Sequence, residues 1–574
     1  MAQRGMIKED FSWYEAGLSL VERKKRGHFS TPPLLVEQIL DACGYTPEAD
    51  LTHLRVLDPA CGSGNFLVGA ARRLKTYGER AGLSLKERAS LIECNLWGFD
   101  PDPVSCFLAE MQLRKAIGNV SPYLHIHQAD SLVLRWEPCV DLFVANPPYL
   151  AARNNDLSGY RFVQGRGQAD SYLLFLNLAL SVVRPGGWIG LVLPDPLLAR
   201  ANAARERAHL LEKVTLHHLW HLSGVFAAEV GAVVIVGQRC ASKSTHQVSW
   251  IRERWRDVGR VAYPRRPQAG YPQGALAPPP QAGQPPGLPL PYTNDDSPSY
   301  GRGTPGGYPG SAVPQSVFLH QPGAELRYLL SSERGVIIER LRTCLEDTSG
   351  RNERLAPLGE FLSICRGEEL GRESPWLVEM APGDSASGLP VLRGGVDIQP
   401  YTIPHAHWQI ARDAIVKPIE RYLSPKLLVV KSTDRLQATL DLQRHVALQT
   451  LYLLHPRNKS SDEDSLYFFL ALLNSQLLRD YTYILHTAYK WVQPQIEQHV
   501  LARLPIPIVA AREERQQVIE RAKSLVCACS KSGAVVEWNE DIIRLYEEQE
   551  RAICALYGTV LPGLFADKGV ILYG

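Results

Sequence analysis

Two short segments in the first half of the chain carry residues whose types and spacing could do chemistry. The first is Asp58-Pro59-Ala60-Cys61-Gly62-Ser63-Gly64, where an acidic residue closes an apolar run and a glycine-rich turn follows. Gly62 and Gly64 lack a Cβ, so this turn can bring its backbone against a ligand. The helix expected from Asn65 onward would point its N-terminus at the same ligand. The segment therefore predicts a binding loop.

The second segment is Asn146-Pro147-Pro148-Tyr149, directly after an apolar run. Two prolines fix φ and remove two N–H groups, so the segment is stiff and presents carbonyl groups without competing donors. The Asn146 side-chain oxygen and the Pro147 carbonyl could accept both N–H bonds of a ring-bound amine. They would then stabilise the positive charge that grows on its nitrogen during attack. A rigid turn is the structural alternative, but the position downstream of a binding loop favours chemistry.

The elements that must position these segments follow from the hydrophobic pattern. Residues 20–260 alternate short apolar strands with amphipathic helices, which predicts an α/β domain with a mostly parallel sheet. Strands are expected at residues 54–57, 96–99, 124–127, 141–144, 188–193, 216–222 and 232–236. Helices are expected at residues 33–43, 65–76, 103–117, 171–183 and 205–211.

Polar groups stand at the ends of four successive expected strands, at Asp58, Asp100, Asp130 and Asn146. Each alone would be read as a strand-end cap, but open α/β sheets bind ligands at this edge. The four together predict one crevice. A dinucleotide site fits poorly, because Leu67 stands where the third glycine belongs. In addition, Asp100 lies roughly 35 residues past the turn instead of about 20.

The remainder of the chain differs from residues 20–260 in composition and hydrophobic pattern. Residues 264–316 are rich in Pro, Gly, Gln and Ala, which predicts a disordered linker, with partner binding as the alternative to a flexible spacer. Residues 317–574 predict a second folded region of mixed α+β type. Its expected strands lie at 427–430 and 450–454, and its expected helices at 467–474 and 512–528.

These segments resemble those of the gamma-class N6-adenine DNA methyltransferases, especially the Taq-type modification enzymes of restriction systems. The family's order is kept in "GHFSTP", "DPACGSG", "GFDPDP", "QAD", "NPPY" and "QADSYLLFLNLALSVVRPGGWIGLVLP". The resemblance implies a Rossmann-like catalytic domain that depends on S-adenosylmethionine and uses no metal. It also implies that the second region is a DNA target-recognition domain, supported by stretches such as "LPVLRGGVDIQPY" and "YKWVQPQIEQHVLARLPIP".

The resemblance assigns roles to the cofactor loop and the strand ends. Thr31 would lie near the cofactor carboxylate, and Asp58, Ala60, Gly62 and Gly64 near the amino-acid end and the sulfonium. Asp100 would accept hydrogen bonds from both ribose hydroxyls, and Asp130 from the adenine amine.

The implied substrate is the N6 amine of an adenine flipped out of double-stranded DNA. Asn146 and Pro147 would hold this amine, and Pro148 would keep the segment stiff. Tyr149 would stack on the base, with Phe226 on the other side. A core phenylalanine is the alternative reading of Phe226.

Several basic residues are candidates for DNA contact. Arg153, Arg161 and Arg166 lie in a polar, glycine-rich loop that could order over DNA or simply be a surface loop. The second region interleaves basic and aromatic residues, a mixture suited to phosphate contacts and base reading. They are Arg366, Arg393, Tyr401, Lys431, Arg435, Tyr489, Lys490 and Trp491, of which Arg393, Lys431 and Lys490 are the predicted DNA contacts.

Three other functions compete. Release-factor methyltransferases modify a protein glutamine with the same tetrapeptide, but they carry a small helical domain first and lack a large C-terminal region. Cytosine N4 enzymes usually carry serine in place of Asn146. A catalytically inactive DNA-binding module would predict damage at Asp58, the two glycines, Asn146 or Tyr149, and all are intact.

Composition restricts the setting. With 45% hydrophobic and 21% charged residues the chain is typical of globular proteins, and a net charge of +2 neither favours nor excludes DNA. Arg23-Lys24-Lys25-Arg26 is a local basic cluster or a solvated start. Scattered cysteines without zinc spacing, no signal peptide and no apolar run near ~20 residues predict a cytoplasmic protein without a membrane partner. The residues before Gly27 are too few for a nuclease domain, so we expect no fused restriction–methylation polypeptide; a separately encoded restriction endonuclease is the expected partner.

Overall fold

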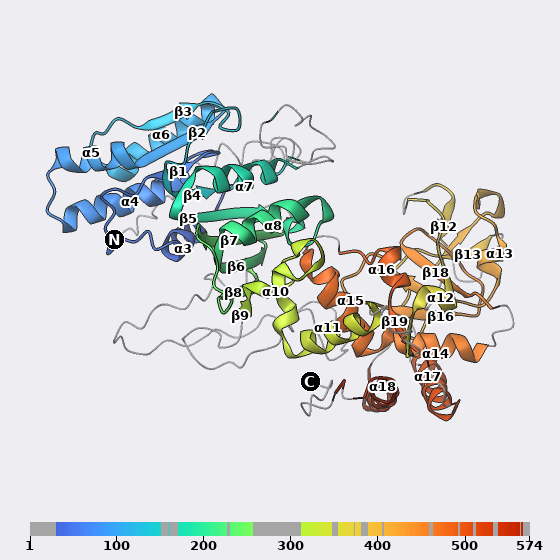
Figure 1. The fold of residues 1–574 in the computed structure, drawn as a ribbon. Coiled ribbons are helices and arrows are strands. Elements are labelled where there is room, and N and C mark those ends of the chain that lie inside the picture. Colours follow the sequence, from blue (N-terminus) through green and yellow to red (C-terminus); the bar gives the residue numbers. More distant parts are fainter. Residues whose placement is uncertain are drawn as a thin grey trace, which may run out of the picture. The chain divides into compact units, whose positions relative to one another are not determined.

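The computed structural model divides the chain into two compact units (Figure 1). The first comprises the described residues up to 255 together with 312–328, and the second the described residues from 329 onward. The structure describes residues 30–150, 160, 170–226, 230–255, 312–346, 354–371, 374–379, 388–395, 397–404, 407–458, 463–491, 494–508, 512–531, 538–562 and 564–565.

A nine-stranded sheet forms the centre of the first unit, in the order β3-β2-β1-β4-β5-β7-β6-β8-β9. The strands from β3 to β5 are parallel, and β7 runs antiparallel to both β5 and β6. Strand β1 lies between β2 and β4, which is the point where the strand order reverses. The loops that follow these parallel strands therefore lie at the same edge of the sheet, where α/β sheets bind ligands. The strands are β1 Val56–Asp58, β2 Leu96–Asp100, β3 His125–Gln128, β4 Val140–Ala145, β5 Val183–Pro194, β6 Thr215–Ser223, β7 Ala232–Gln238, β8 Gln247–Arg254 and β9 Ala312–Pro314.

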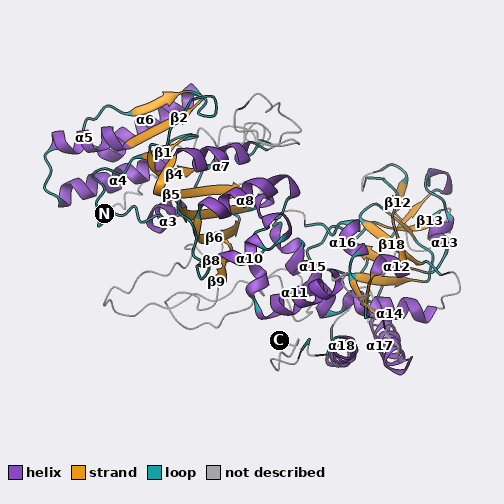
Figure 2. Ribbon diagram, viewed as in Figure 1, coloured by secondary structure: helices purple, strands orange, loops and turns teal. Residues whose placement is uncertain are grey.

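Helices surround this sheet, and they confirm the predicted α/β class (Figure 2). Helix α4 packs against both α3 and α6, and α7 packs against both β5 and α8. All five predicted helices are present, while α5 and α10 were not predicted. The helices are α3 Pro33–Ala42, α4 Asn65–Arg80, α5 Leu85–Asn95, α6 Pro103–Ile117, α7 Ser171–Val182, α8 Ala204–Lys213 and α10 Gln315–Leu319.

The chain returns to the first unit after the Pro/Gly-rich segment, which shifts the domain boundary placed at residue 317. Strand β9, inside the segment predicted as a linker, pairs with β8, which was also not predicted. The Gln315 side chain donates to the carbonyls of Leu211 and Val214 at 3.1 and 2.7 Å and accepts the Leu216 N–H at 2.8 Å. Three strand residues beside a biased segment are too short for a periodicity to show.

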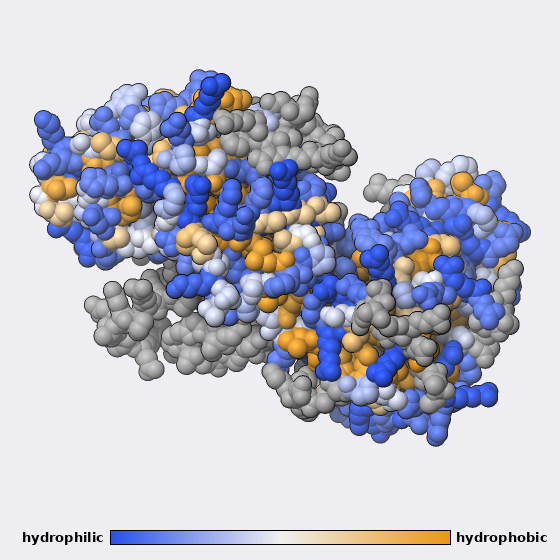
Figure 3. All heavy atoms as spheres, viewed as in Figure 1, coloured by the Kyte–Doolittle hydropathy of each residue, from blue (hydrophilic) through white to orange (hydrophobic). Residues whose placement is uncertain are grey.

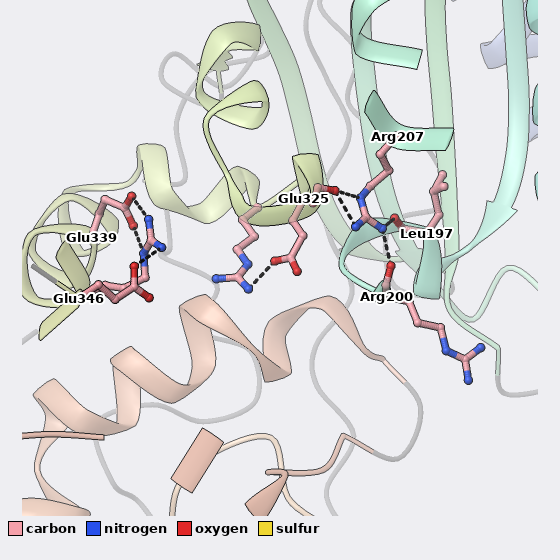
Figure 4. A network of polar contacts seen from close by, with 9 residues as sticks. Leu197, Arg200, Arg207, Glu325, Glu339 and Glu346 are labelled. Atoms are coloured by element: carbon pink, nitrogen blue, oxygen red, sulfur yellow. Dashed lines mark hydrogen bonds and ion pairs between the residues drawn. The ribbon is translucent and has the colours of Figure 1, made fainter. Parts of the chain in front are cut away.

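Arg207 secures this returning segment from within the unit. Its side chain is fully buried, and its guanidinium donates twice to the Gly323 carbonyl, at 3.1 and 2.8 Å. It also donates to the carbonyls of Leu197 and Arg200 at 3.0 and 2.7 Å (Figure 4). Because a buried guanidinium must find acceptors for its donors, Arg207 fixes residues 312–328 to the first unit.

The second unit has the mixed α+β character that the sequence predicts. It holds two four-stranded sheets, β11-β18-β15-β16 and β12-β14-β13-β17, and the pair β10-β19. The strands are β10 Leu355–Pro357, β11 Leu362–Arg366, β12 Leu377–Glu379, β13 Leu389–Leu392, β14 Trp408–Ile410, β15 Lys426–Val430, β16 Ala438–Asp441, β17 Val446–Ala447, β18 Leu451–Pro456 and β19 Pro505–Pro507. The helices are α11 Glu333–Glu346, α12 Leu358–Phe361, α13 Glu420–Leu423, α14 Glu463–Asn474, α15 Gln476–Leu485, α16 Gln498–Ala502, α17 Arg512–Lys531 and α18 Glu540–Val560.

Each unit contains a core cluster of buried apolar residues. One core cluster gathers residues of α3, α4 and the nine-stranded sheet, and another lies on the small sheets of the second unit. Hydrophilic residues cover most of the face of each unit that Figure 3 shows. Across the described ranges, every helix is too short or too polar to cross a bilayer.

Candidate active site

A cavity of about 220 Å³ opens at the carboxyl edge of β1 to β4 in the first unit. The structure brings together here all four strand-end groups singled out in the sequence: Asp58, Asp100, Asp130 and Asn146. The other lining residues are Ser30, Thr31, Pro59, Ala60, Cys61, Gly62, Ser63, Asn65, Phe66, Pro101, Ser131, Leu132, Pro148, Leu150, Tyr160, Ser171 and Phe175.

The loop after β1 has the conformation that its glycines allow. Gly62 and Gly64 have φ values of +51° and +90°, in the left-handed region that other residues rarely adopt. Gly64 caps α4, and a Cβ added to it would lie 2.9 Å from the Ala109 Cβ and 3.0 Å from the Ala109 Cα on α6. Gly64 therefore turns the chain into α4 and lets α6 pack closely behind the loop.

Two side chains from other segments, neither of them expected from the sequence, form hydrogen bonds to the backbone of this loop. Gln112 on α6 donates to the Ser63 carbonyl at 2.9 Å. Ser131, which follows β3, is 1% exposed and donates to the Pro59 carbonyl at 2.7 Å. These bonds fix the loop in one geometry before a ligand arrives. Nothing in the spacing of either residue marks it, because the contacts depend on tertiary structure.

Asp58 is the most deeply buried carboxyl of the cavity. It is 2% exposed, and its Oδ1 accepts the Ala60 N–H at 3.2 Å. Burial raises the pKa of Asp58 to about 8, and the negative charge of Asp100 adds to this effect. A cationic group placed beside Asp58 would favour its ionised form and lower this pKa.

Asp100 and Asp130 are tied to their own turns but keep hydrogen-bonding capacity. Asp100 accepts the N–H groups of Gly62 and Asp102 at 3.0 and 2.9 Å, one on each oxygen. Asp130 accepts the Leu132 N–H at 3.0 Å and the Tyr160 hydroxyl at 2.8 Å, again one on each oxygen. Since a carboxylate offers about four acceptor sites, each residue can still receive hydrogen bonds from a ligand.

The segment before α3 closes one side of the cavity. The Asn65 side-chain amide donates to the Ser30 Oγ and to the Thr31 carbonyl, both at 2.9 Å. Thr31 is 4% exposed and lines the cavity, as its predicted role near the cofactor requires. Gly27-His28-Phe29 and the basic cluster at 23–26 lie outside the described residues.

The Asn-Pro-Pro-Tyr segment follows β4 directly. Asn146 and Pro148 line the cavity, while Pro147 is buried. The Tyr149 hydroxyl donates to the Val192 carbonyl at 3.3 Å, and burial raises the pKa of this hydroxyl well above its usual value. The Pro148 carbonyl accepts the Ser171 hydroxyl, so the Pro147 carbonyl is the better candidate for an incoming amine.

Phe226 packs against Tyr149 in this conformation. Phe226 is 4% exposed and belongs to the core cluster of the unit. The two ring centroids lie 6.2 Å apart and the planes meet edge-on at 80°. A base could stand between these rings only after one of them turns, so the predicted sandwich is not preformed.

Of the three predicted DNA contacts of the second unit, one is exposed and two are half-buried. Arg393 binds the buried Asp397 at 3.2 Å and lies 4.4 Å from the centroid of the Trp408 ring, so its guanidinium already has partners. Lys431 is half-buried and Lys490 is exposed. The candidates of the loop after Tyr149, namely Arg153, Arg161 and Arg166, lie outside the described residues.

Two aromatic candidates for DNA contact are better explained as core residues. Tyr401 and Tyr489 are each 1% exposed, which contradicts a base-reading role on the surface. Tyr401 also has a φ of +67° and receives a hydrogen bond from Gln549 at 2.6 Å. The interleaved pattern did not distinguish these buried rings from surface rings.

The electrostatics of the cavity select among ligands. Three carboxyl groups line it, and its lining within the described residues includes neither lysine nor arginine. Among the described lining residues a pyrophosphate would therefore find no cation, whereas a ligand with a positive centre would be attracted. In the part of the chain that the structure describes, no cluster of three histidine, cysteine or acidic side chains could hold a metal ion.

Comparison with known proteins identifies a family for one stretch in each half of the chain. Residues 12–255 match the family model for N-6 DNA methylases, and residues 389–506 match the TaqI-like C-terminal specificity domain. The chain thus contains an N-6 DNA methylase domain followed by a TaqI-like specificity domain. This order confirms the resemblance to the Taq-type enzymes.

Individual relatives are more distant. The type II methyltransferase M.VspI of Vibrio sp. (strain 343) is 25% identical over 32% of this chain and 40% of its own length. The type II methyltransferase M.XhoI of Xanthomonas vasicola is 27% identical over 34% and 38%. The matches span about two fifths of these relatives. The type IIL restriction-modification enzyme MmeI, solved with DNA, shares the fold with a TM-score of 0.54 at 12% identity over 95% of this chain and 78% of its own.

Proposed function

We propose that this chain, an N-6 DNA methylase domain with a TaqI-like specificity domain, methylates the N6 amine of adenine at specific sites in double-stranded DNA. One observation carries the proposal. A cavity with three carboxyl groups and no basic residue in its described lining reaches a rigid acceptor segment, Asn146-Pro147-Pro148-Tyr149, at the next strand end. A cationic methyl donor in the cavity and a weakly nucleophilic amine at the acceptor segment would lie next to each other there.

The residues of the cavity fit S-adenosylmethionine. Asp100 would accept hydrogen bonds from the ribose hydroxyls, and Asp130 from the adenine amine. The buried Asp58 would face the positively charged amino-acid end and sulfonium region, with Thr31 near the carboxylate. Once bound, this cofactor supplies a methyl group on a positively charged sulfur.

The acceptor segment would prepare the target amine. The lone pair of an exocyclic amine is delocalised into its ring, so the nitrogen is a poor nucleophile. The Asn146 side-chain oxygen and the Pro147 carbonyl would accept its two N–H bonds and stabilise the positive charge that develops on it. Tyr149 would stack on the base after it leaves the duplex, and Phe226 would contact its other face.

DNA recognition would fall to the second unit. Its specificity-domain match makes DNA a better substrate than a protein glutamine, because release-factor methyltransferases lack such a domain. We therefore place the chain as the modification component of a restriction–modification or phage-defence system. A separately encoded restriction endonuclease would be its partner.

The test is expression in a bacterial host that lacks DNA methylation, followed by long-read mapping of modified bases. The expected result is N6-methyladenine at every copy of one short sequence, and none with the Asn146→Ala variant. Unmodified DNA in cells that contain folded wild-type protein would contradict the proposal, as would modified cytosine. Methylation of a protein glutamine instead would support the alternative.

A further inference from the structure

The first residue of helix α7 lies against the acceptor segment. Ser171 is 3% exposed and lines the same cavity as Asn146. Its hydroxyl donates to the Pro148 carbonyl and accepts the Leu150 N–H at 2.9 Å. The Ser171 N–H in turn donates to the Leu150 carbonyl at 3.0 Å. One residue thus holds the backbone on both sides of Tyr149.

These bonds meet a need that the two prolines create. Pro147 and Pro148 have no N–H, so this part of the segment can be held only through its carbonyls. The side chain that grips Pro148 must donate a hydrogen bond, and the one that grips Leu150 must accept one. A hydroxyl does both from one atom, whereas alanine can do neither.

Helix α7 gives Ser171 a firm base. Every residue of this helix except Ser181 is buried, and Leu173, Leu174 and Leu176 are fully so. Close packing of this kind transmits small displacements instead of absorbing them. Because the prolines keep φ nearly fixed, a constraint at Pro148 extends back to Asn146.

We infer that Ser171 is a positioning residue for methyl transfer, which holds the acceptor segment in the geometry that receives the target amine. The effect on methyl transfer rests on the proposed function. The structural part of the inference, the hydrogen bond between the Ser171 hydroxyl and the Leu150 N–H, does not depend on that function.

The experiment compares the full-length wild type with Ser171→Ala, Ser171→Thr and the control Ser475→Ala. Ser475 is a matched control, because it is also fully buried at a helix start and its hydroxyl donates to the Leu472 carbonyl at 2.6 Å and accepts the Leu478 N–H at 3.3 Å. Three quantities are measured: cofactor affinity by calorimetry, single-turnover methyl transfer to saturating unmethylated DNA, and hydrogen exchange of the peptide that contains Leu150.

We expect Ser171→Ala to slow the single-turnover rate roughly tenfold to hundredfold, as a small misplacement of reacting groups does. Cofactor affinity should stay within about twofold, Leu150 should exchange faster, and Ser171→Thr should recover most of the rate. Ser475→Ala should lower the melting temperature without slowing transfer. Unchanged exchange at Leu150 would overturn the inference even if no DNA were methylated. An unchanged rate in Ser171→Ala, or an equal loss in Ser475→Ala, would overturn it while leaving the proposed function intact.

Discussion

Replacing Asp58 by asparagine should abolish a specific pH dependence of cofactor binding. In the cofactor-free protein the buried Asp58 carboxyl has a pKa raised from 3.8 to about 8, chiefly by burial. A bound cation would favour the ionised form and lower this pKa. Cofactor binding near neutral pH would therefore release a proton from Asp58.

The magnitude follows from this linkage. When binding releases one proton, the dissociation constant falls tenfold for each unit that the pH rises while the pH stays well below the pKa of the free protein. With a pKa of about 8, it should fall about fiftyfold between pH 6 and pH 8. Above about pH 8 the affinity should level off. The sign for stability is the opposite: the raised pKa stabilises the cofactor-free fold at low pH, and this contribution is lost as the pH rises toward 8.

The assay is titration calorimetry of S-adenosylmethionine binding at several pH values, in buffers that differ in ionisation enthalpy to count released protons. The cofactor's own amino group titrates in the same range, and subtracting the Asp58→Asn profile removes this contribution. Asp130→Asn is the matched control and should bind more weakly with the wild-type slope. A wild-type affinity that is flat from pH 6 to 8, or an equal slope in Asp58→Asn, would show that Asp58 does not release a proton when the cofactor binds.

Three further substitutions test separate parts of the site. Asn146→Ala should abolish methyl transfer and leave cofactor affinity nearly unchanged, as measured by labelled-methyl incorporation and calorimetry; substantial turnover would contradict the acceptor role. Tyr149→Ala should weaken the hold on the flipped base by about 1–3 kcal/mol, which is measurable as loss of transfer efficiency on DNA, and an undiminished efficiency would remove the stacking role. Gly64→Ala should lower the free energy of unfolding by about 1–3 kcal/mol from backbone strain alone, and more because the new Cβ meets Ala109 at 2.9 Å. Gly82→Ala, with a φ of +68° and open space around it, should show the strain without the clash in the same denaturant titration.

The sequence predicted the catalytic unit well because its signals are local. The helix expected at residues 103–117 coincides with α6, Pro103–Ile117, which begins after the N-cap Asp102 and ends before the C-cap Gly118. Apolar runs located the parallel strands to within a few residues. The strand-end residues Asp58, Asp100, Asp130 and Asn146 could be predicted to converge, because topology alone brings parallel strand ends to one edge.

What the sequence did not reveal depends on contacts between distant segments. Strand β9 is three residues long and follows a biased stretch, so only its pairing with β8 identifies it. Ser171 forms hydrogen bonds with two backbone groups more than twenty residues away, and the spacing of residues in the sequence does not indicate such contacts. Burial likewise distinguishes Tyr401 and Tyr489 from the surface aromatics that they resemble in sequence.

The most direct measurement follows a labelled methyl group from S-adenosylmethionine to its product. Purified protein is incubated with unmethylated duplex DNA and the labelled cofactor, and the DNA is then digested to nucleosides and separated. We expect the label to elute as N6-methyl-2′-deoxyadenosine and to disappear with Asn146→Ala. Label on cytosine, on protein alone, or nowhere in the DNA despite bound cofactor would contradict methylation of adenine N6 by this chain.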